Sequence, residues 1–346
     1  MLLDRYGPKR VNASLLLIAA AGALWFALAR SPLELTLARA VMGLGVSAGL
    51  MASLSAFALW HPAERLATLN GVAFATGMLG AIAATVPLEY ALRSMGWREV
   101  FYGIVALNLA VCLALYLVVP ERAAGRRAAP LAEQLREFSA LARDPAFWRV
   151  AVCIGSSQFA AVSLGTLWVA TWLRDVAGYG QPEVARALLL FAVAMIAGYL
   201  GFGRLADARA HAGRSALPLL AGGIAAGSAC LALLALGVRA GALALWTGFF
   251  TATSAAVLAY ALFARRYPQA MAGRVNTALN VFVFIGMFSG QWAVGAVLSL
   301  WPQTGIGYAP EGYTWALGLL WAIQLSGLVW LWSGRRLFEQ QTAPVT

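Results

Sequence analysis

Ten long apolar segments constrain the fold of this chain more than any other feature of its sequence. A helix of about 20 apolar residues crosses the roughly 30 Å hydrocarbon layer of a bilayer, and connections that contain Pro or Gly separate the segments. Of the 346 residues, 61% are hydrophobic and 11% are charged, far from the soluble average of about 45–50% apolar and about 25% charged residues. The sequence therefore predicts an all-α, polytopic membrane protein. The predicted spans are residues 11–29, 33–60, 70–92, 100–119, 147–173, 186–205, 216–238, 241–264, 275–300 and 313–337.

One long polar stretch, residues 121–149, divides these spans into four before it and six after it. Many secondary transporters consist of two matching helix bundles. We therefore predict an incomplete N-terminal bundle at residues 1–120, a cytoplasmic linker at 121–146 and a C-terminal six-helix bundle at 147–346. The imbalance suggests that ten of an expected twelve helices are present and that the first two are missing.

The net charge of +11 has two interpretations, nucleic-acid binding or membrane topology. The basic residues lie in the connections between apolar spans instead of forming one patch with aromatics, and Lys and Arg gather on alternate connections. This asymmetry follows the positive-inside rule and excludes a nucleic-acid partner. The chain is predicted to be a multi-pass protein of the cell (inner) membrane with both termini in the cytoplasm.

The N-terminal ten residues carry the strongest motif. The chain begins Met1-Leu2-Leu3-Asp4-Arg5-Tyr6-Gly7-Pro8-Lys9-Arg10. This stretch resembles the loop between the second and third helices of the major facilitator superfamily, which reads roughly Gly-x-Leu-x-Asp-Arg-x-Gly-x-Arg/Lys-Arg. A weaker copy follows the sixth span, as Gly203-Arg204-Leu205-Ala206-Asp207-Ala208-Arg209. In this family the second bundle repeats the motif at the same place.

The resemblance implies two bundles, containing family helices 3–6 and 7–12, and secondary transport by alternating access. It also implies a conformational switch in each copy of the loop. Partly exposed ion pairs contribute only about 0–1 kcal/mol each, so such contacts can be remade during a transport cycle. The alternative is that these basic loops only set the topology. The predicted switch residues are Asp4, Arg5, Gly7, Lys9, Arg10, Gly203, Arg204, Asp207 and Arg209.

Two charged residues inside spans are candidates for substrate binding or proton coupling. Arg39 begins a stretch that resembles the family's fourth-helix motif, Arg-x-x-x-Gly-x-Gly, and lies roughly two turns into its span. A charge there costs about 2.5–3.5 kcal/mol on insertion scales. Arg39 is therefore expected to bind an anionic substrate or take part in proton coupling. The alternative is that its side chain snorkels to the interface or braces the bundle. Glu89 is a candidate proton carrier, with an interfacial position as the alternative.

Polar side chains also recur at helical spacing in the second bundle, where they either line a cavity or hold neighbouring helices together. By the family's helix order, the fifth and eighth spans would line the central cavity and the ninth would flank it. The candidate cavity residues are Gln158, Trp172, Thr247, Thr251, Asn276, Asn280 and Gln291.

We therefore expect a secondary transporter of a small solute, driven by a proton or other ion gradient or by the gradient of the substrate. One alternative is a non-transporting fragment that results from a misplaced start or a deletion. Another is a multi-pass membrane enzyme, but no His, Asp and Glu residues cluster as metal ligands or as an acid and base pair. We expect no enzyme activity, no cofactor and no metal, and a monomer whose partners are the lipid bilayer, a small-molecule substrate and protons.

Overall fold

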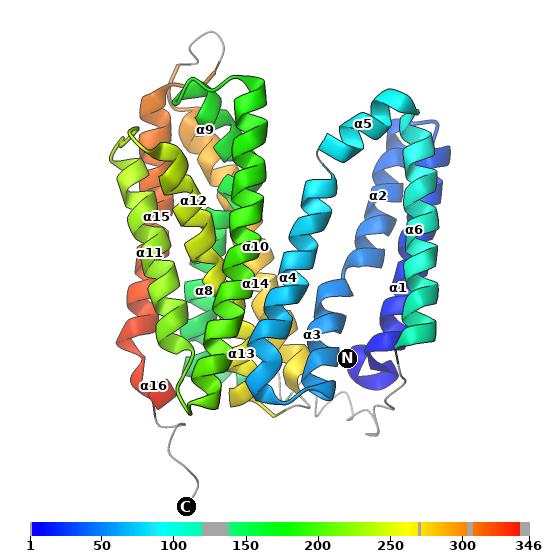
Figure 1. The fold of residues 1–346 in the computed structure, drawn as a ribbon, viewed down its shortest axis with the longest axis horizontal. Helices are drawn as coiled ribbons and strands as arrows, with labels where there is room; N and C mark the ends of the chain where they lie inside the picture. Colours follow the sequence, from blue (N-terminus) through cyan, green and yellow to red (C-terminus); the bar gives the residue numbers. More distant parts are fainter. Residues whose placement is uncertain are drawn as a thin grey trace, which may run out of the picture. The chain divides into compact units, whose positions relative to one another are not determined.

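The computed structural model describes residues 2–84, 86–119, 136, 139–268, 271–302 and 307–339, with only the backbone at 2–5, 86, 87, 89, 272 and 339 (Figure 1). Within this part of the chain, 10 helical segments are long and apolar enough to cross a membrane. The predicted polytopic helical fold is therefore confirmed. Of the linker predicted at residues 121–146, all but residue 136 and residues 139–146 lie outside the described residues.

The chain forms two compact units that are interleaved in sequence. Unit 1 contains Met1–Trp60, Leu79–Phe138 and Pro268–Arg274, and unit 2 contains His61–Met78, Ser139–Tyr267 and Val275–Thr346. The first part of the third span thus belongs to the same unit as the C-terminal helices, whereas the predicted division was a single boundary in the linker.

In unit 1, helix α1 packs against both α2 and α6 (Figure 1). Two glycines allow the close approach of α1 and α2: a Cβ on Gly22 would lie 2.8 Å from the backbone nitrogen of Met42, and a Cβ on Gly45 would collide with Ala19. The helices of this unit are α1 (Leu2–Leu28), α2 (Pro32–Val46), α3 (Gly49–Trp60), α5 (Val86–Ser94) and α6 (Trp97–Val118).

Two predicted boundaries in this part of the chain differ from the structure. Helix α1 begins at Leu2 instead of residue 11 and is interrupted at Gly7, where φ is 80° and ψ is 154°. The span predicted at 70–92 divides into α4 (Leu66–Ala83) and α5. Pro87 has no N–H to donate to the carbonyl of Ala83, so α4 cannot continue through it.

Unit 2 is built around aromatic side chains. Trp246 has no exposed surface, stacks on Phe250 with ring centroids 5.9 Å apart and meets Trp172 edge-on at 5.5 Å. Helix α15 packs against α8 and α11, and α12 packs against α10 and α11 (Figure 1). Besides the start of α4, the unit contains η1 (Ala63–Arg65), α8 (Pro145–Ser163), η2 (Leu164–Trp168), α9 (Val169–Asp175), α10 (Gln181–His211), α11 (Leu217–Ala235), α12 (Ala242–Thr253), η3 (Ser254–Val257), α13 (Leu258–Arg266), α14 (Ala272–Leu298, from Val275), α15 (Pro310–Ser333) and α16 (Arg336–Glu339).

Two spans of unit 2 depart from regular α-helix. The segment η2 is a π-helical turn between α8 and α9, and η3 is a 3-10 turn between α12 and α13. Because a π turn pairs each residue with the fifth along instead of the fourth, it rotates the side chains that follow it. Gln158 and Trp172, which regular helix would place on one face, therefore lie on either side of a change in register.

Candidate functional site

Asp207 lies near the C-terminal end of α10 and joins this helix to the first turn of α4. Its carboxylate accepts a hydrogen bond from the backbone N–H of Ala67 at 3.1 Å and another from that of Thr68 at 3.0 Å. The first N–H groups of a helix have no partner within the helix and carry the positive end of its dipole. Asp207, which is only 9% exposed, thus caps α4 from a different helix.

Two glycines bring α4 and α10 close enough for this cap. A Cβ on Gly203 would lie 2.8 Å from the carbonyl oxygen of Ala67 and 2.9 Å from Cα of Thr68, and one on Gly71 would collide with the carbonyl oxygen of Tyr199. Gly203 was predicted as a switch residue. Gly71 was not, although it lies one turn after Ala67 on the same face of α4.

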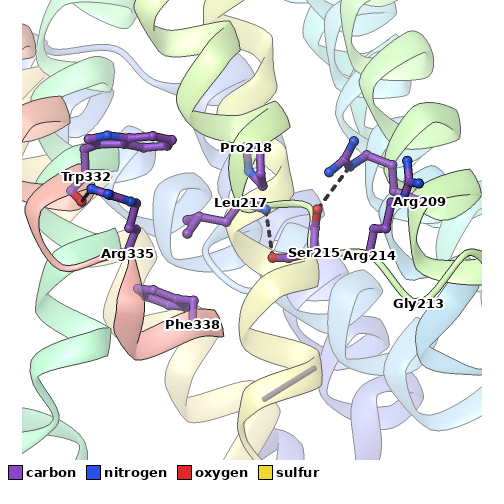
Figure 2. A pocket seen from close by; sticks show the side chains of 9 residues that line it. All are labelled: Arg209, Gly213, Arg214, Ser215, Leu217, Pro218, Trp332, Arg335 and Phe338. Carbon is purple, nitrogen blue, oxygen red and sulfur yellow. Dashed lines mark hydrogen bonds between the residues drawn. The ribbon is translucent and has the colours of Figure 1, made fainter. Parts of the chain in front are cut away.

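The remaining residues of this second motif copy shape the connection after α10 (Figure 2). The Arg209 Nε donates to the carbonyl oxygen of Ser215 at 3.1 Å, and Gly213 has a φ of +67°, which favours glycine. Arg204 is exposed, and its side chain forms no hydrogen bond or ion pair with the described residues. The structure thus separates the predicted switch residues into a helix cap and a loop brace.

The N-terminal copy of the motif lies in unit 1. Gly7 forms the interruption of α1, and the ammonium group of Lys9 lies 4.8 Å from the centre of the Tyr116 ring on α6. Arg10 is exposed. The side chains of Asp4 and Arg5 lie outside the described residues, so their predicted roles stay predictions.

Arg39 lies in the middle of α2, about 10 Å along the helix axis from its first residue at 1.5 Å per residue. Its guanidinium group lies 5.5 Å from the centre of the Phe26 ring, which in turn stacks on Phe101 at 4.3 Å. Within unit 1 the Arg39 side chain is exposed. The other charged candidate, Glu89, has a side chain outside the described part of the chain.

Gln291 is the predicted cavity residue with the most defined surroundings. Its amide Nε2 donates to the hydroxyl of Thr166 at 2.7 Å, and its backbone carbonyl accepts from the indole N–H of Trp168 at 3.1 Å. Both partners belong to the π-helical turn η2, and π turns occur frequently at functional sites. Thr166 and Trp168 were not predicted as site residues, because the residue types in this segment do not indicate a π turn.

Asn280 also has a partner on another helix, since its Oδ1 accepts from the Tyr260 hydroxyl at 3.4 Å. By contrast, Trp172 is buried in the aromatic core of unit 2. The hydroxyl groups of Thr247 and Thr251 bond to carbonyls one turn earlier in α12. The side-chain amides of Asn276, at 5% exposure, and of half-buried Gln158 form no hydrogen bond with any described residue. The structure does not gather these candidates into one cluster.

A charged cluster at the ends of two spans was also missed. Asp144 accepts hydrogen bonds from the Tyr267 hydroxyl at 2.6 Å and from the backbone of Ala146 at 2.8 Å, and forms an ion pair with Arg266 at 3.2 Å. Burial alone would raise the pKa of Asp144, but these hydrogen bonds and the positive charge outweigh it and lower the pKa. The pKa of Tyr267 is raised by burial and by its bond to Asp144. The sequence signal for this position is the pair Asp144-Pro145, because Asp is favoured as a helix N-cap and Pro as the first helical residue.

Comparison with known proteins identifies the family. The model of the Major Facilitator Superfamily matches residues 1–291, so the chain belongs to this superfamily. It is 25% identical over 220 residues to the probable sulfoacetate transporter SauU of Cupriavidus necator, covering 58% of this chain and 49% of that protein. It is 39% identical over 80 residues to the nitrate/nitrite transporter NrtP of Picosynechococcus sp., covering 23% of this chain and 15% of that one. The chain thus aligns with about half the length of its curated relatives or less.

Solved structures support the same fold. The human organic anion transporter MFSD10 superposes with a TM-score of 0.72 at 15% identity, covering 95% of this chain and 78% of that one. The transporter FucP in its outward conformation gives 0.69 at 16% identity, covering 94% and 83%. At these identities the likeness concerns the fold alone.

Proposed function

We propose that this chain is a secondary transporter of a small anion that works by alternating access, with both termini in the cytoplasm. The observation that carries the proposal is the double hydrogen bond from the first turn of α4 to Asp207. Membership of the superfamily supports transport across a membrane; the mechanism and the substrate class are our inference.

The Asp207 contact has the strength that a reversible switch needs. A hydrogen bond to a charged group contributes about 1.5–3 kcal/mol, and each elementary charge that crosses the membrane supplies about 2.3 kcal/mol per 100 mV. Two or three coupled charges can therefore break and remake the two bonds at this potential. Helix α4 begins in unit 2 and continues past Met78 into unit 1. A contact at its first turn can therefore control the movement of α4 against α10.

The anionic substrate follows from Arg39. A guanidinium group in the middle of a span is costly and is retained where it contacts a ligand or a cavity. The relatives named for sulfoacetate and for nitrate and nitrite carry small anions, which agrees with a positive charge at this position. We propose that the positive charge of Arg39 attracts the anionic substrate.

In unit 2 we assign Gln291 and Thr166 to polar contact with the substrate. The amide and hydroxyl donate and accept hydrogen bonds, and they meet at a π turn, where a small change in helix pairing can alter the distance between them. Glu89 stays the candidate proton carrier. Gln158, Trp172, Thr247, Thr251, Asn276 and Asn280 stay candidates for the rest of the path.

Electrical currents on a solid-supported membrane test the proposal. The purified protein in liposomes is exposed to nitrate, sulfoacetate and other small anions, with a neutral sugar as the comparison. We expect saturable currents with at least one anion, their loss in Arg39→Gln, and their retention in Arg30→Gln, a control at the exposed end of the neighbouring span. Currents with the sugar alone, or full activity of Arg39→Gln, would contradict the assignment.

A further inference from the structure

A cavity lies in unit 2 beside the C-terminal end of α10. Its volume is about 300 Å³, and it opens where three membrane spans end or begin. Its lining comes from the end of α10, the connection to α11, the start of α11 and the chain from the end of α15 to α16 (Figure 2). The lining residues are Arg209, Gly213, Arg214, Ser215, Leu217, Pro218, Trp332, Arg335 and Phe338.

All charged side chains among the described residues that line this cavity are arginines. Arg209 and Arg214 lie on one side of it and Arg335 on the other (Figure 2), and the lining residues that the structure describes include no Asp or Glu. Arg209 donates one N–H to the carbonyl of Ser215. A guanidinium group has five N–H donors, so others are left to meet a ligand. Arg214 is exposed, and its guanidinium group forms no hydrogen bond or ion pair with the described residues, although its backbone N–H bonds to the carbonyl of Arg209. The cavity therefore offers several donors to an anion.

The walls of the cavity are apolar and aromatic. Trp332 is 47% exposed, whereas Phe338 is 7% exposed and forms a buried wall. The guanidinium group of Arg335 lies 5.1 Å from the centre of the Trp332 ring. Trp side chains concentrate at the level of the lipid headgroups, and arginines close to them can reach phosphate oxygens bidentately.

We propose that this cavity binds the phosphate group of an anionic phospholipid. The three arginines surround the phosphate, Trp332 lies at the headgroup level, and the lipid chains extend into the bilayer along the adjoining spans. Basic pockets between the ends of membrane helices on the cytoplasmic side are suited to such headgroups, and the predicted topology places this end of the spans there. The site is independent of the proposed transport substrate.

Native mass spectrometry of the detergent-purified protein tests this proposal by titration with cardiolipin, phosphatidylglycerol and phosphatidylcholine. We expect the anionic lipids to bind about tenfold or more tightly than the zwitterionic one, since each basic side chain near a membrane surface adds to the attraction. The variant in which Arg209, Arg214 and Arg335 are changed to Gln is expected to lose this preference.

A matched control removes the same charge elsewhere in unit 2. Arg174, Arg186 and Arg239 are exposed and lie near the opposite ends of the spans, and their triple change to Gln is expected to leave lipid binding unchanged. Should the first triple variant fail to fold, Arg214→Gln alone, whose side chain is exposed and has no partner among the described residues, is expected to weaken binding about fivefold.

A soluble ligand is distinguished by competition. Inorganic phosphate and glycerol phosphate at millimolar concentration are expected to leave bound cardiolipin in place. Displacement of the lipid by either compound would overturn the proposal in favour of a soluble phosphate ligand. Equal binding of all three lipids, or equal loss in both triple variants, would overturn it as well.

Discussion

The backbone N–H of Thr68 donates a 3.0 Å hydrogen bond to Oδ2 of Asp207, which lies 139 positions later in the chain. The neighbouring N–H of Ala67 bonds to the other carboxylate oxygen at 3.1 Å. A helix N-terminus and a carboxylate attract each other through both hydrogen bonding and the helix dipole. Helix α4 is therefore held at its first turn by one side chain of α10.

Replacing Asp207 by Asn removes the charge and one of the two acceptor oxygens. We expect the free energy of unfolding to fall by about 1–3 kcal/mol, because one N–H of α4 is left without an acceptor in a buried place. We also expect slower transport. Thermal unfolding in detergent and the currents described above measure the two effects.

Glu183→Gln is the matched control for this variant. Glu183 also accepts from a backbone N–H at a helix start, that of Gly180 at 2.7 Å, but it lies at the other end of α10 and is exposed. We expect little change from it. Equal losses in the two variants would show that Asp207 is only a generic helix cap.

Gly203→Ala tests the close approach of α10 to α4. Its Cβ would meet backbone atoms of Ala67 and Thr68, which cannot move aside as a flexible side chain can. We expect a lower unfolding temperature and a weakened Asp207 contact. Gly201→Ala on the same helix meets no atom within 4 Å, and should be neutral or stabilising by up to about 1 kcal/mol, the helix-propensity gain. Similar unfolding temperatures for both variants would rule out tight packing here.

Thr166→Val tests the polar pair at the π turn. The change preserves the shape of the side chain and removes the hydroxyl that accepts from Gln291. We expect the half-saturating substrate concentration to rise about tenfold, which corresponds to the loss of one hydrogen bond of about 1.4 kcal/mol. Ser326→Ala on α15, whose hydroxyl bonds only within its own helix, serves as the control. An unchanged concentration dependence in Thr166→Val would remove this pair from the substrate path.

The Asp144 cluster predicts a dependence of stability on pH. Because the pKa of Asp144 is lowered in the folded protein, its contribution is fully present above the unfolded value of about 3.9 and is lost as pH falls through the lowered folded pKa. Tyr267→Phe removes a hydrogen bond to the carboxylate and moves that folded pKa upward. We expect this variant to unfold more readily than the native protein at pH 7, with a smaller difference at pH 3.

Arg265→Gln controls for a change at the same end of α13, since the Arg265 side chain is exposed and has no partner among the described residues. Its unfolding temperature should follow that of the native protein at every pH. A difference between Tyr267→Phe and the native protein that is equally large at pH 3 and pH 7 would contradict the role of Asp144 ionisation.

The membrane spans and the family could be predicted from the sequence because both depend on local patterns. Apolar length defines a span, and the spacing of Gly203, Asp207 and Arg209 reproduces a motif within one loop. The helical membrane spans of the structure confirm the fold class, and the match to the superfamily model confirms the family. The interruption at Gly7 lies within the other motif copy, where residues 2–6 are helical and were expected to be a loop.

The contacts between distant segments could not be predicted in the same way. Nothing near Asp207 indicates that its partner is the first turn of α4, because a backbone N–H carries no sequence signal. The π turn at Leu164–Trp168 likewise depends on hydrogen-bond pairing and not on residue type. Trp172, a candidate for the cavity, packs edge-on against Trp246 on the far side of this turn from Gln158.

Hydrogen–deuterium exchange of the amides of Ala67 and Thr68, in protein reconstituted in liposomes, tests the Asp207 contact most directly. In the native protein and in Glu183→Gln we expect both amides to exchange slowly. In Asp207→Asn we expect exchange about tenfold faster or more, the factor that corresponds to about 1.4 kcal/mol of lost protection. Equal exchange rates in the native protein and in Asp207→Asn would show that the carboxylate does not hold α4, and would contradict the proposed switch.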